Sequence, residues 1–251
     1  MDSPHTPHHR LAVQARIGVL TLDADLPLHA DWTLLFGPSG SGKSSLLRAA
    51  CGLLPAAAIT FTRHSPVDPG ATPTTLQSST TFIPPEQRSL GWAPQQPALF
   101  PHLTVLENIE FAHRSHPSPA GPSLVSEALT LFRLDPLGRR LPAQLSGGES
   151  QRVNLARAYA RPDCRLLLLD EPFAGIDRTL RDQILPDLRS ALCRRGIPVL
   201  SVSHDVEEAF LLDCEVILLR DGRIHDRGPA ATVLAPERDG LLRSLTPDTS
   251  R

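Results

Sequence analysis

The chain has 251 residues, a formal net charge of −2 and 41% hydrophobic residues. A charge so close to zero argues against a basic surface for nucleic acid, and no apolar run approaches the roughly 20 residues that span a bilayer. The first ten residues are polar and lack the apolar core of a secretion signal. We therefore expect a cytoplasmic protein whose membrane role, if it has one, comes through a partner.

The first third of the chain contains a glycine-rich loop at Gly37–Ser44, which reads G-P-S-G-S-G-K-S. Arg16–Leu22 and Trp32–Phe36 before it are short and β-prone, and they predict a small β layer that leads into a central strand. Ser45–Leu54 after it predicts a helix. This order of strand, loop and helix is the context that the pattern G-x-x-x-x-G-K-[ST] requires.

The composition of this loop indicates that it binds the phosphates of a nucleotide. Its three glycines allow backbone N–H groups to point inward, and the positive end of the following helix attracts phosphate oxygens. Lys43 would place a charge at the β- and γ-phosphates, and the Ser44 hydroxyl would bind Mg²⁺. The predicted phosphate-binding residues are Gly37, Pro38, Ser39, Gly40, Ser41, Gly42, Lys43, Ser44 and Ser45.

A proline-rich region follows the first helix. Pro66–Thr81 predicts a surface loop, and Leu90–Ala93 predicts a strand. The segment Pro94–Pro97 then places two glutamines between prolines, close to Leu99 and Phe100. These residues alone fit either a stiff functional loop or an ordinary proline-rich turn.

The middle of the chain is helical. Leu103–Arg114 and Ser123–Phe132 have the periodicity of amphipathic helices, and a third helix is predicted to end near Ala160. Together they predict a helical insert at about residues 103–158 that lies outside the sheet.

The third helix begins at Leu145–Arg152, which reads L-S-G-G-E-S-Q-R. Ser146 predicts an N-cap, and Glu149 three residues later completes a capping box. The free amides of Gly147 and Gly148 at the helix start form a second candidate anion site. An ordinary capped helix explains the same residues.

Arg165–Leu169 predicts a buried strand of a parallel sheet, and Asp170 and Glu171 follow it directly. Two carboxylates at the end of a buried strand are costly unless they bind a metal or act chemically, and open α/β sheets bind ligands at this edge. We expect Asp170 to hold Mg²⁺, directly or through water, and Glu171 to polarise the attacking water as general base.

A second polar side chain, His204, follows the next buried strand, predicted at Pro198–Ser203. A lone histidine is more often structural, but its position level with the carboxylates favours a contact with a γ-phosphate. The remaining elements predicted here are helices at Leu180–Arg195 and Glu207–Leu212 and a hairpin of Glu215–Leu219 and Arg223–Ile224 around an Asp-Gly turn.

In combination, these motifs resemble the ATP-binding cassette family from about Leu11 to Pro236. Leu145–Arg152 matches the family signature LSGGQ/E-x-QR, and Gly37–Ser44 and Asp170–Pro172 match two further motifs. The resemblance implies an α/β fold: a P-loop NTPase (RecA-like) core with an antiparallel β subdomain and an inserted α-helical subdomain. It implies one ATPase domain at residues 10–236, with tails at 1–9 and 237–251. Importer members of the family commonly carry an extra C-terminal regulatory β domain, and we expect none in this sequence, which is a departure from that pattern.

The resemblance also implies roles for single residues. Gly37–Ser44 would be the Walker A loop and Leu166–Glu171 the Walker B strand, with ATP and Mg²⁺ bound between them. Gln95 resembles the Q-loop glutamine, which contacts Mg²⁺ and senses the γ-phosphate. Asp177 resembles the D-loop aspartate, and His204 resembles the switch histidine.

In this family two cassettes pair head to tail. Ser146, Gly147 and Gly148 of one chain would close on the γ-phosphate that Lys43 of the other chain holds. The resemblance therefore implies a homodimer with two ATP at its interface, which hydrolysis weakens.

Pro84–Gly91 and Leu99–Ile109 resemble importer ATPases for oxyanions, sugars and polyamines, and Ile184–Leu188 and Gly196–Val199 are similar to those for molybdate. The resemblance implies an ATPase subunit at the cytoplasmic face of the inner (plasma) membrane, bound to an integral membrane permease and working with a substrate-binding protein. Sulfate, polyamine, sugar or iron import are alternatives, as is a soluble switch that acts on DNA or ribosomes. A regulatory module without turnover is disfavoured by Glu171.

One departure from the family concerns the adenine. Family members usually have an aromatic residue upstream of Walker A that stacks on the base, yet no Phe, Tyr or Trp precedes Trp32. We expect Arg16 to stack on the adenine instead, through a cation–π contact.

Overall fold

The computed structural model describes residues 9–28, 31–54, 58–63 and 74–236. The strands are β1 His9–Ile17, β2 Leu20–Leu28, β3 Trp32–Phe36, β4 Ala58–Arg63, β5 Thr74–Gln77, β6 Leu90–Ala93, β7 Leu166–Asp170, β8 Val199–Val202, β9 Glu215–Arg220 and β10 Arg223–Pro229. The helices are α1 Lys43–Ala50, α2 Val105–Ser115, α3 Gly121–Leu131, α4 Gly147–Tyr159, α5 Arg178–Arg194, α6 Val206–Leu212 and α7 Ala230–Val233, with short 3₁₀ turns at Pro85–Gln87, Asp135–Leu137 and Pro142–Gln144. Within these ranges no helix is both long and apolar enough to cross a membrane.

The described strands form one mixed sheet in the order β5-β4-β1-β2-β10-β9-β3-β8-β7-β6. Strands β9, β3, β8, β7 and β6 are parallel neighbours, and β7 is apolar up to its last residue with all of its side chains buried. A strand that is buried on both faces reads as a continuous apolar run, which explains why these strands were predictable. The α/β class predicted from the sequence is confirmed.

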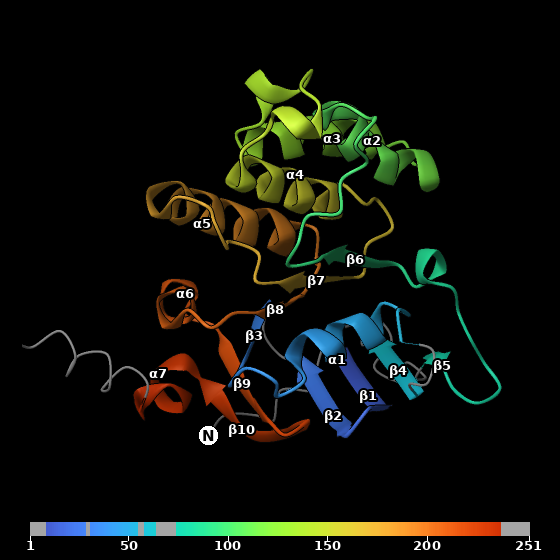
Figure 1. Cartoon of the computed structure of the whole chain (residues 1–251), viewed down its shortest axis with the longest axis vertical. Coiled ribbons are helices and arrows are strands. Elements are labelled where there is room, and N and C mark those ends of the chain that lie inside the picture. The colour runs from blue at the N-terminus through green and yellow to red at the C-terminus, as the bar shows by residue number, and fades with distance from the viewer. Residues whose placement is uncertain (1–8, 29–30, 55–57, 64–73, 237–251) are drawn as a thin grey trace, which may run out of the picture.

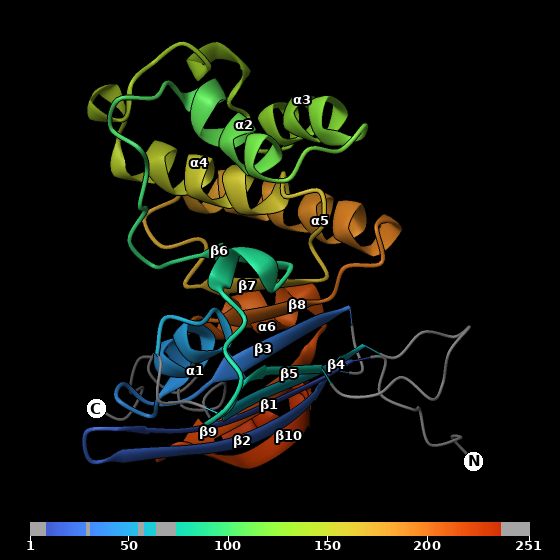
Figure 2. The same ribbon diagram turned by 90° about the vertical axis from the view of Figure 1, so that its right-hand side faces the viewer.

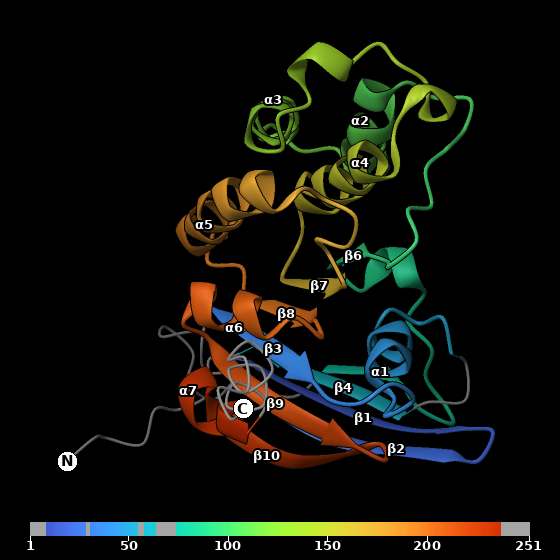
Figure 3. The same ribbon diagram turned by 60° about the vertical axis from the view of Figure 1, so that its left-hand side comes forward.

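Helix α1 lies on one face of the parallel strands, whereas α5, α6 and α7 lie on the opposite face (Figure 3). The antiparallel strands β1, β2 and β4 curl around α1, so that this helix is enclosed by the sheet (Figure 2). Leu46 and Leu47 of α1 are fully buried against leucines of both halves, and each contributes about 2 kcal/mol of hydrophobic stabilisation. This enclosure fixes the start of α1 relative to the ends of the parallel strands.

The two halves of the sheet are joined at the predicted Asp-Gly turn. Asp221 and Gly222 both have positive φ, at 46° and 77°, and a Cβ on Gly222 would collide with the carbonyl oxygen of Thr21. The amide of Asp23 donates to the Gly222 carbonyl at 2.9 Å, beside the single parallel pair of β2 and β10. The antiparallel strands predicted from the sequence are therefore present, and they join the parallel strands in one continuous sheet.

Helices α2, α3 and α4 gather at one end of the molecule, beyond β6 and β7 (Figure 1). Both helix starts with a capping box have the expected geometry. The Thr104 hydroxyl accepts from the Glu107 amide at 3.3 Å, and the Ser146 hydroxyl accepts from the Glu149 amide at 3.2 Å. Local sequence signals therefore placed these helices correctly to within a few residues.

Two strands differ from their predictions. Thr74–Gln77 lies inside the segment predicted as a loop and pairs with β4, while residues 66–73 of that segment are outside the described residues. Strand β10 continues to Pro229, five residues beyond the predicted Ile224, and α7 follows it. His225, Asp226 and Arg227 are exposed and polar, so pairing with β9 rather than an apolar pattern keeps them in the sheet.

Candidate nucleotide-binding site

The glycine-rich loop connects the carboxyl end of β3 to the start of α1. Pro38, Ser39 and Gly40 form an exposed tip, whereas Ser41 is buried with its hydroxyl unpaired among the described residues. Gly37 has φ 149°, and a Cβ there would collide with the Leu219 carbonyl oxygen. Glycine is thus required by the close approach of β9, and the orphaned Ser41 hydroxyl leaves a polar group for a bound ligand.

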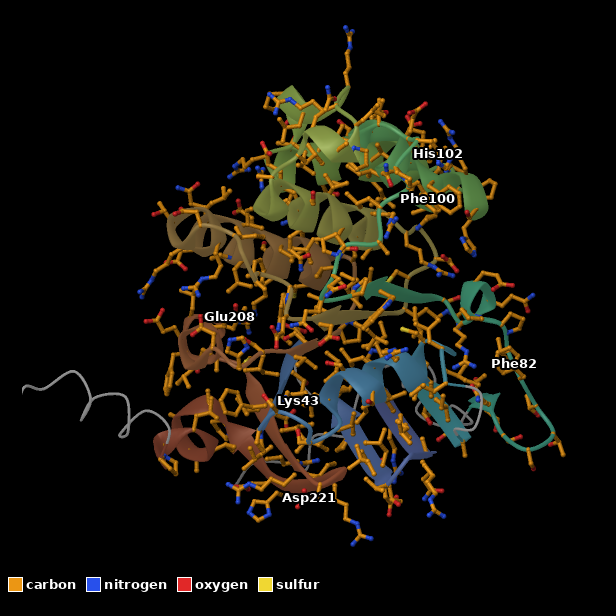
Figure 4. All side chains as sticks on the ribbon, in the orientation of Figure 1. Lys43, Phe82, Phe100, His102, Glu208 and Asp221 are labelled. Atoms are coloured by element: carbon orange, nitrogen blue, oxygen red, sulfur yellow. The ribbon has the colours of Figure 1, made fainter. Side chains whose placement is uncertain are left out.

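Lys43 lies at the N-terminal end of α1 (Figure 4). Its Nζ donates to the carbonyl oxygens of Gly37 at 2.7 Å and Pro38 at 2.9 Å, so it curls back over its own loop. Burial lowers the pKa of the Lys43 ammonium, while Glu171 and Asp170 nearby raise it. The ammonium is therefore central to the loop and within the field of both carboxylates.

Ser44 and Asp170 meet as the predicted cation site requires. The Ser44 hydroxyl donates to Oδ1 of Asp170 at 2.9 Å, although the two residues are 126 positions apart. Asp170 is only 4% exposed, and burial raises the pKa of its carboxyl group. The Ser44 hydroxyl and the buried Asp170 carboxylate provide the hard oxygen ligands that suit Mg²⁺.

Glu171 lies between Gln95 and His204. Gln95 Nε2 donates to Glu171 Oε2 at 2.9 Å, and His204 Nδ1 lies 3.2 Å from Glu171 Oε1. The three residues come from the loops after β6, β7 and β8, whose carboxyl ends lie at the same sheet edge. The structure therefore brings the residue predicted to activate water, Glu171, together with the two residues predicted to sense the γ-phosphate.

The second candidate anion site lies at the start of α4. Ser146 and Gly147 are exposed, and Glu149 accepts from the Ser146 amide at 2.7 Å, which holds the pKa of the Glu149 carboxyl below its ordinary value. Within the described part of the chain, Ser146 forms no hydrogen bond with the glycine-rich loop. This end of α4 thus remains open on the surface of a single chain.

Asp177 caps α5 by accepting from the Leu180 amide at 3.2 Å. One turn later, the buried Arg181 binds Asp205 at 2.5 Å between Nη1 and Oδ2. Asp205 follows His204 directly, so this ion pair ties the start of α5 to the loop that carries His204. Sequence reasoning missed Arg181, although its spacing of four from Asp177 and the sequence His-Asp were available signals.

Arg16 is placed differently from the other predicted site residues. Arg16 is exposed on β1, where it pairs with Thr21 of β2. Leu20 and Leu22, the residues on either side of Thr21, lie on the other face of the hairpin. A Cβ on Gly42 would lie 2.5 Å from Leu22 and 3.0 Å from Leu20, so that other face packs on the glycine-rich loop. The prediction that Arg16 stacks on the adenine finds no support in this geometry.

An apolar groove of about 270 Å³ lies beside the Gln95 loop, between the end of α1, β6, α2 and α4. Leu53 and Phe111 on its walls are unusually exposed for large apolar side chains, at 46% and 40%. Arg157 of α4 also lines it, with its guanidinium 5.5 Å from the centre of the Phe100 ring. Arg157 has no ion-pair partner among the described residues, and Glu86 and the ion-paired Arg161 also line the groove.

Comparison with known proteins agrees with these observations. A family profile described as ABC transporter matches residues 24–174. The chain is 38% identical over 230 residues to the molybdenum import ATP-binding protein ModC of Thiobacillus denitrificans, covering 89% of this chain and 61% of that protein. It is 36% identical over 238 residues to the molybdate/tungstate import ATP-binding protein WtpC of Archaeoglobus fulgidus, covering 94% and 93%.

Other relatives point to the same fold. The Fe(3+) ions import ATP-binding protein FbpC of Streptomyces coelicolor is 42% identical over 211 residues, covering 83% of this chain and 57% of that protein. The ATP-binding cassette MJ0796, solved as a dimer in a post-hydrolysis state with ADP and Pi, superposes with a TM-score of 0.70 at 25% identity and covers 88% of this chain and 98% of that one. The chain spans about three fifths of the ModC relatives that it matches. The predicted P-loop fold is confirmed, and the chain belongs to the ABC transporter family.

Proposed function

We propose that the chain is the ATP-hydrolysing subunit of an importer for molybdate or a similar oxyanion, working as a homodimer on a membrane permease. The observation that carries the ATPase part is the position of Glu171. Its carboxylate lies between Gln95 and His204, next to the Ser44–Asp170 pair that is suited to Mg²⁺. A base, a metal site and a phosphate loop at one sheet edge are the parts that phosphoryl transfer to water needs.

Binding of ATP would begin at the glycine-rich loop. Its backbone amides and the start of α1 attract the phosphates, and Lys43 exchanges its contacts with the Gly37 and Pro38 carbonyls for phosphate oxygens. Ser44 and Asp170 would hold Mg²⁺, which supplies positive charge for the β- and γ-phosphates. The 2.9 Å contact between Ser44 and Asp170 supports this assignment.

Hydrolysis would depend on Glu171 taking a proton from water. The hydrogen bond from Gln95 occupies Oε2 of this carboxylate, so movement of the Gln95 side chain toward the Ser44–Asp170 pair would leave Oε2 free to accept a proton from water. The side chain of His204 is 74% exposed, which leaves its second ring nitrogen free to donate to a γ-phosphate. Both neighbours of the base thus sense whether ATP is present.

A second copy of the chain would complete the site. Ser146 and Gly147 offer an exposed helix start that binds no group of its own chain's phosphate loop. A head-to-tail pair would place this end of α4 on the γ-phosphate of the other copy, with Asp177 near the same interface. The dimeric state of the related cassette MJ0796 supports this arrangement.

A permease would bind the groove beside the Gln95 loop, which links the nucleotide to the surface. The apolar walls suit a short amphipathic segment, and Arg157 suits a carboxylate on that segment. Attachment through such a segment would keep the chain at the cytoplasmic face of the inner membrane. A substrate-binding protein would select the cargo on the other side, because the ATPase subunit does not touch it.

The cargo proposal is supported by relatives for molybdate and tungstate, whereas the FbpC relatives support iron as the second candidate. The test is to purify the tagged chain from detergent-solubilised native membranes and identify its partners by mass spectrometry. Recovery of a permease and a binding protein that binds molybdate or tungstate is expected. A binding protein for Fe³⁺ would overturn the cargo, and recovery of soluble factors alone would favour the soluble switch.

A further inference from the structure

Helix α4 carries two buried carboxamides on the face that packs against the catalytic loops, Gln151 and Asn154. They are three residues apart, so they lie on one side of the helix, and they are 2% and 0% exposed. Figure 1 shows α4 lying directly beyond β6 and β7, whose ends carry the site. Neither residue has a role in the proposed mechanism so far.

Each carboxamide donates to the backbone of a catalytic loop. Gln151 Nε2 lies 3.3 Å from the carbonyl oxygen of Glu171 and 3.1 Å from that of Pro172. Asn154 Nδ2 lies 2.8 Å from the carbonyl oxygen of Pro94, the residue before Gln95. One helix therefore holds the backbone of both the general base and its amide neighbour.

The base is also in a conformation that needs support. Glu171 has φ 46°, in the left-handed region that side chains other than glycine rarely adopt. Such a residue keeps this conformation only where its surroundings hold it in place. The two hydrogen bonds from Gln151 lie directly at this turn, so they are well placed to hold the Glu171 carboxylate in its position.

The other half of each carboxamide is unused. Gln151 Oε1 and Asn154 Oδ1 are both buried and have no hydrogen-bond partner among the described residues. Leaving a buried acceptor unpaired is unfavourable, and a purely structural position would be filled as well by an apolar side chain. Within the described part of the chain, only the NH₂ group of each carboxamide forms hydrogen bonds, and both groups bind the two loops. We take these contacts with the loops to be the function of Gln151 and Asn154.

The same helix begins at the site proposed to face the partner's ATP. Gly148 packs so closely on the turn after Glu171 that a Cβ there would lie 2.6 Å from the Gly175 carbonyl oxygen. Gln151 follows Gly148 within one turn of α4. The exposed start of α4 and the turn that carries the base are thus one packed unit.

We infer that Gln151 and Asn154 are positioning residues that couple engagement of the α4 start by the partner's ATP to Glu171 and Gln95 of the same chain. This inference rests on the proposed ATPase dimer. A small shift of α4 on binding would move both loops together, because each is tied to it by a buried hydrogen bond. Cooperativity between the two ATP sites follows from this connection.

The test compares apolar isosteres with a matched control in the full chain. Gln151→Met and Asn154→Leu remove the donors while keeping volume. The control Gln77→Met removes a carboxamide that is 1% exposed, donates to Leu54 at 2.9 Å and accepts from Arg88 at 2.8 Å, so it disrupts buried hydrogen bonds away from the site. We expect kcat to fall about tenfold or more in both α4 variants with KM for ATP nearly unchanged. The Hill coefficient should fall to about 1 in both, and the control should match the wild type.

A double-mutant cycle separates positioning from general destabilisation. If Asn154 acts through the Gln95 loop, Asn154→Leu should lower kcat when it is introduced into the wild type. It should cause no further decrease in kcat when it is introduced into the Gln95→Ala variant. Thermal unfolding identifies any variant that fails to fold. If one of the two α4 variants fails to fold, the other one alone tests the inference.

Hydrogen exchange gives a measurement that does not depend on turnover. Without ATP, peptides covering residues 91–97 and 168–175 should exchange faster in the matching α4 variant than in Gln77→Met. Unchanged exchange together with unchanged kcat and cooperativity would overturn the inference. A wild type without ATPase activity would refute the proposed function, and the exchange comparison would still decide whether these side chains hold the loops.

Discussion

Gln95 Nε2 donates to Glu171 Oε2 at 2.9 Å, so the amide proposed to bind Mg²⁺ rests on the base proposed to activate water. The carboxylate of the proposed base is therefore engaged by its own neighbour within a single chain. The Gln95 side chain therefore links the loop beside the groove to the carboxylate that is proposed to activate water next to the nucleotide. The variants below test separate parts of that connection.

Ser146→Arg should abolish hydrolysis while ATP binding to the monomer remains. The long cation would fill the exposed start of α4 and remove its cap, but it lies away from the phosphate loop of its own chain. ATPase assays and equilibrium binding of a fluorescent ATP analogue check this. Ser126→Arg, at an exposed serine on α3, is the control and should behave like the wild type. Normal turnover in Ser146→Arg would remove α4 from the mechanism.

Of the 25 Lys and Arg residues in the chain, 24 are arginine, so Lys43 is the one lysine. Burial lowers the pKa of its ammonium, which favours reaction with amine-directed reagents. Mg²⁺–ATP should protect Lys43 from acetylation by about tenfold or more at saturation, since the phosphates then occupy it. Mass spectrometry gives the result, with the α-amino group as internal control. Equal labelling of Lys43 with and without ATP would contradict its assignment to the phosphates.

Glu208 should make stability depend on pH. Burial raises its pKa to about 7, helped by Asp205 and opposed by Ser203, Arg181 and His204. Between these two pKa values the folded chain keeps the Glu208 proton, whereas the unfolded chain, with its ordinary pKa of 4.5, releases it. The free energy of unfolding therefore falls as the pH rises from about 4.5 to 7. The loss amounts to about 3 kcal/mol at most.

Replacing the carboxyl group tests this directly. Glu208→Gln should remove that decline. The unfolding free energy of the variant minus that of the wild type should therefore increase from pH 5 to pH 8. Chemical denaturation at several pH values measures both proteins. Parallel pH profiles for the two would show that Glu208 ionises normally in the fold.

Arg16→Ala should leave the affinity for ATP nearly unchanged, because Arg16 lies on the face of the β1–β2 hairpin away from Gly42. Equilibrium binding of ATP and GTP measures both affinity and base preference. A large loss of affinity for ATP, with GTP unaffected, would restore the cation–π contact that the sequence suggested.

The parts of the site that were predictable are those with local signals. The glycine spacing, the capping box at Ser146 and the acidic pair after an apolar strand are each read within ten residues. Gln95 was identified through the family resemblance and His204 also through its position after the next buried strand, and the structure brings both to Glu171.

The rest depends on contacts between distant segments. Arg181 with Asp205 and Asn154 with Pro94 are pairs that no periodicity reveals, and they became visible only in the folded chain. Strand β5 likewise exists through pairing with β4 rather than through its own polar sequence. The face that Arg16 occupies is likewise set by strand register, which the sequence does not show, so its stacking on the adenine stays a prediction.

The most direct test of the central claim is the mass of Glu171→Gln in solution, measured by light scattering with and without Mg²⁺–ATP. This variant removes the base but keeps the phosphate loop, so turnover should fall about 100-fold or more while ATP stays bound. We predict one chain per particle without ATP and two chains with it. Particles of one chain with ATP bound would contradict the proposed ATP-linked dimer.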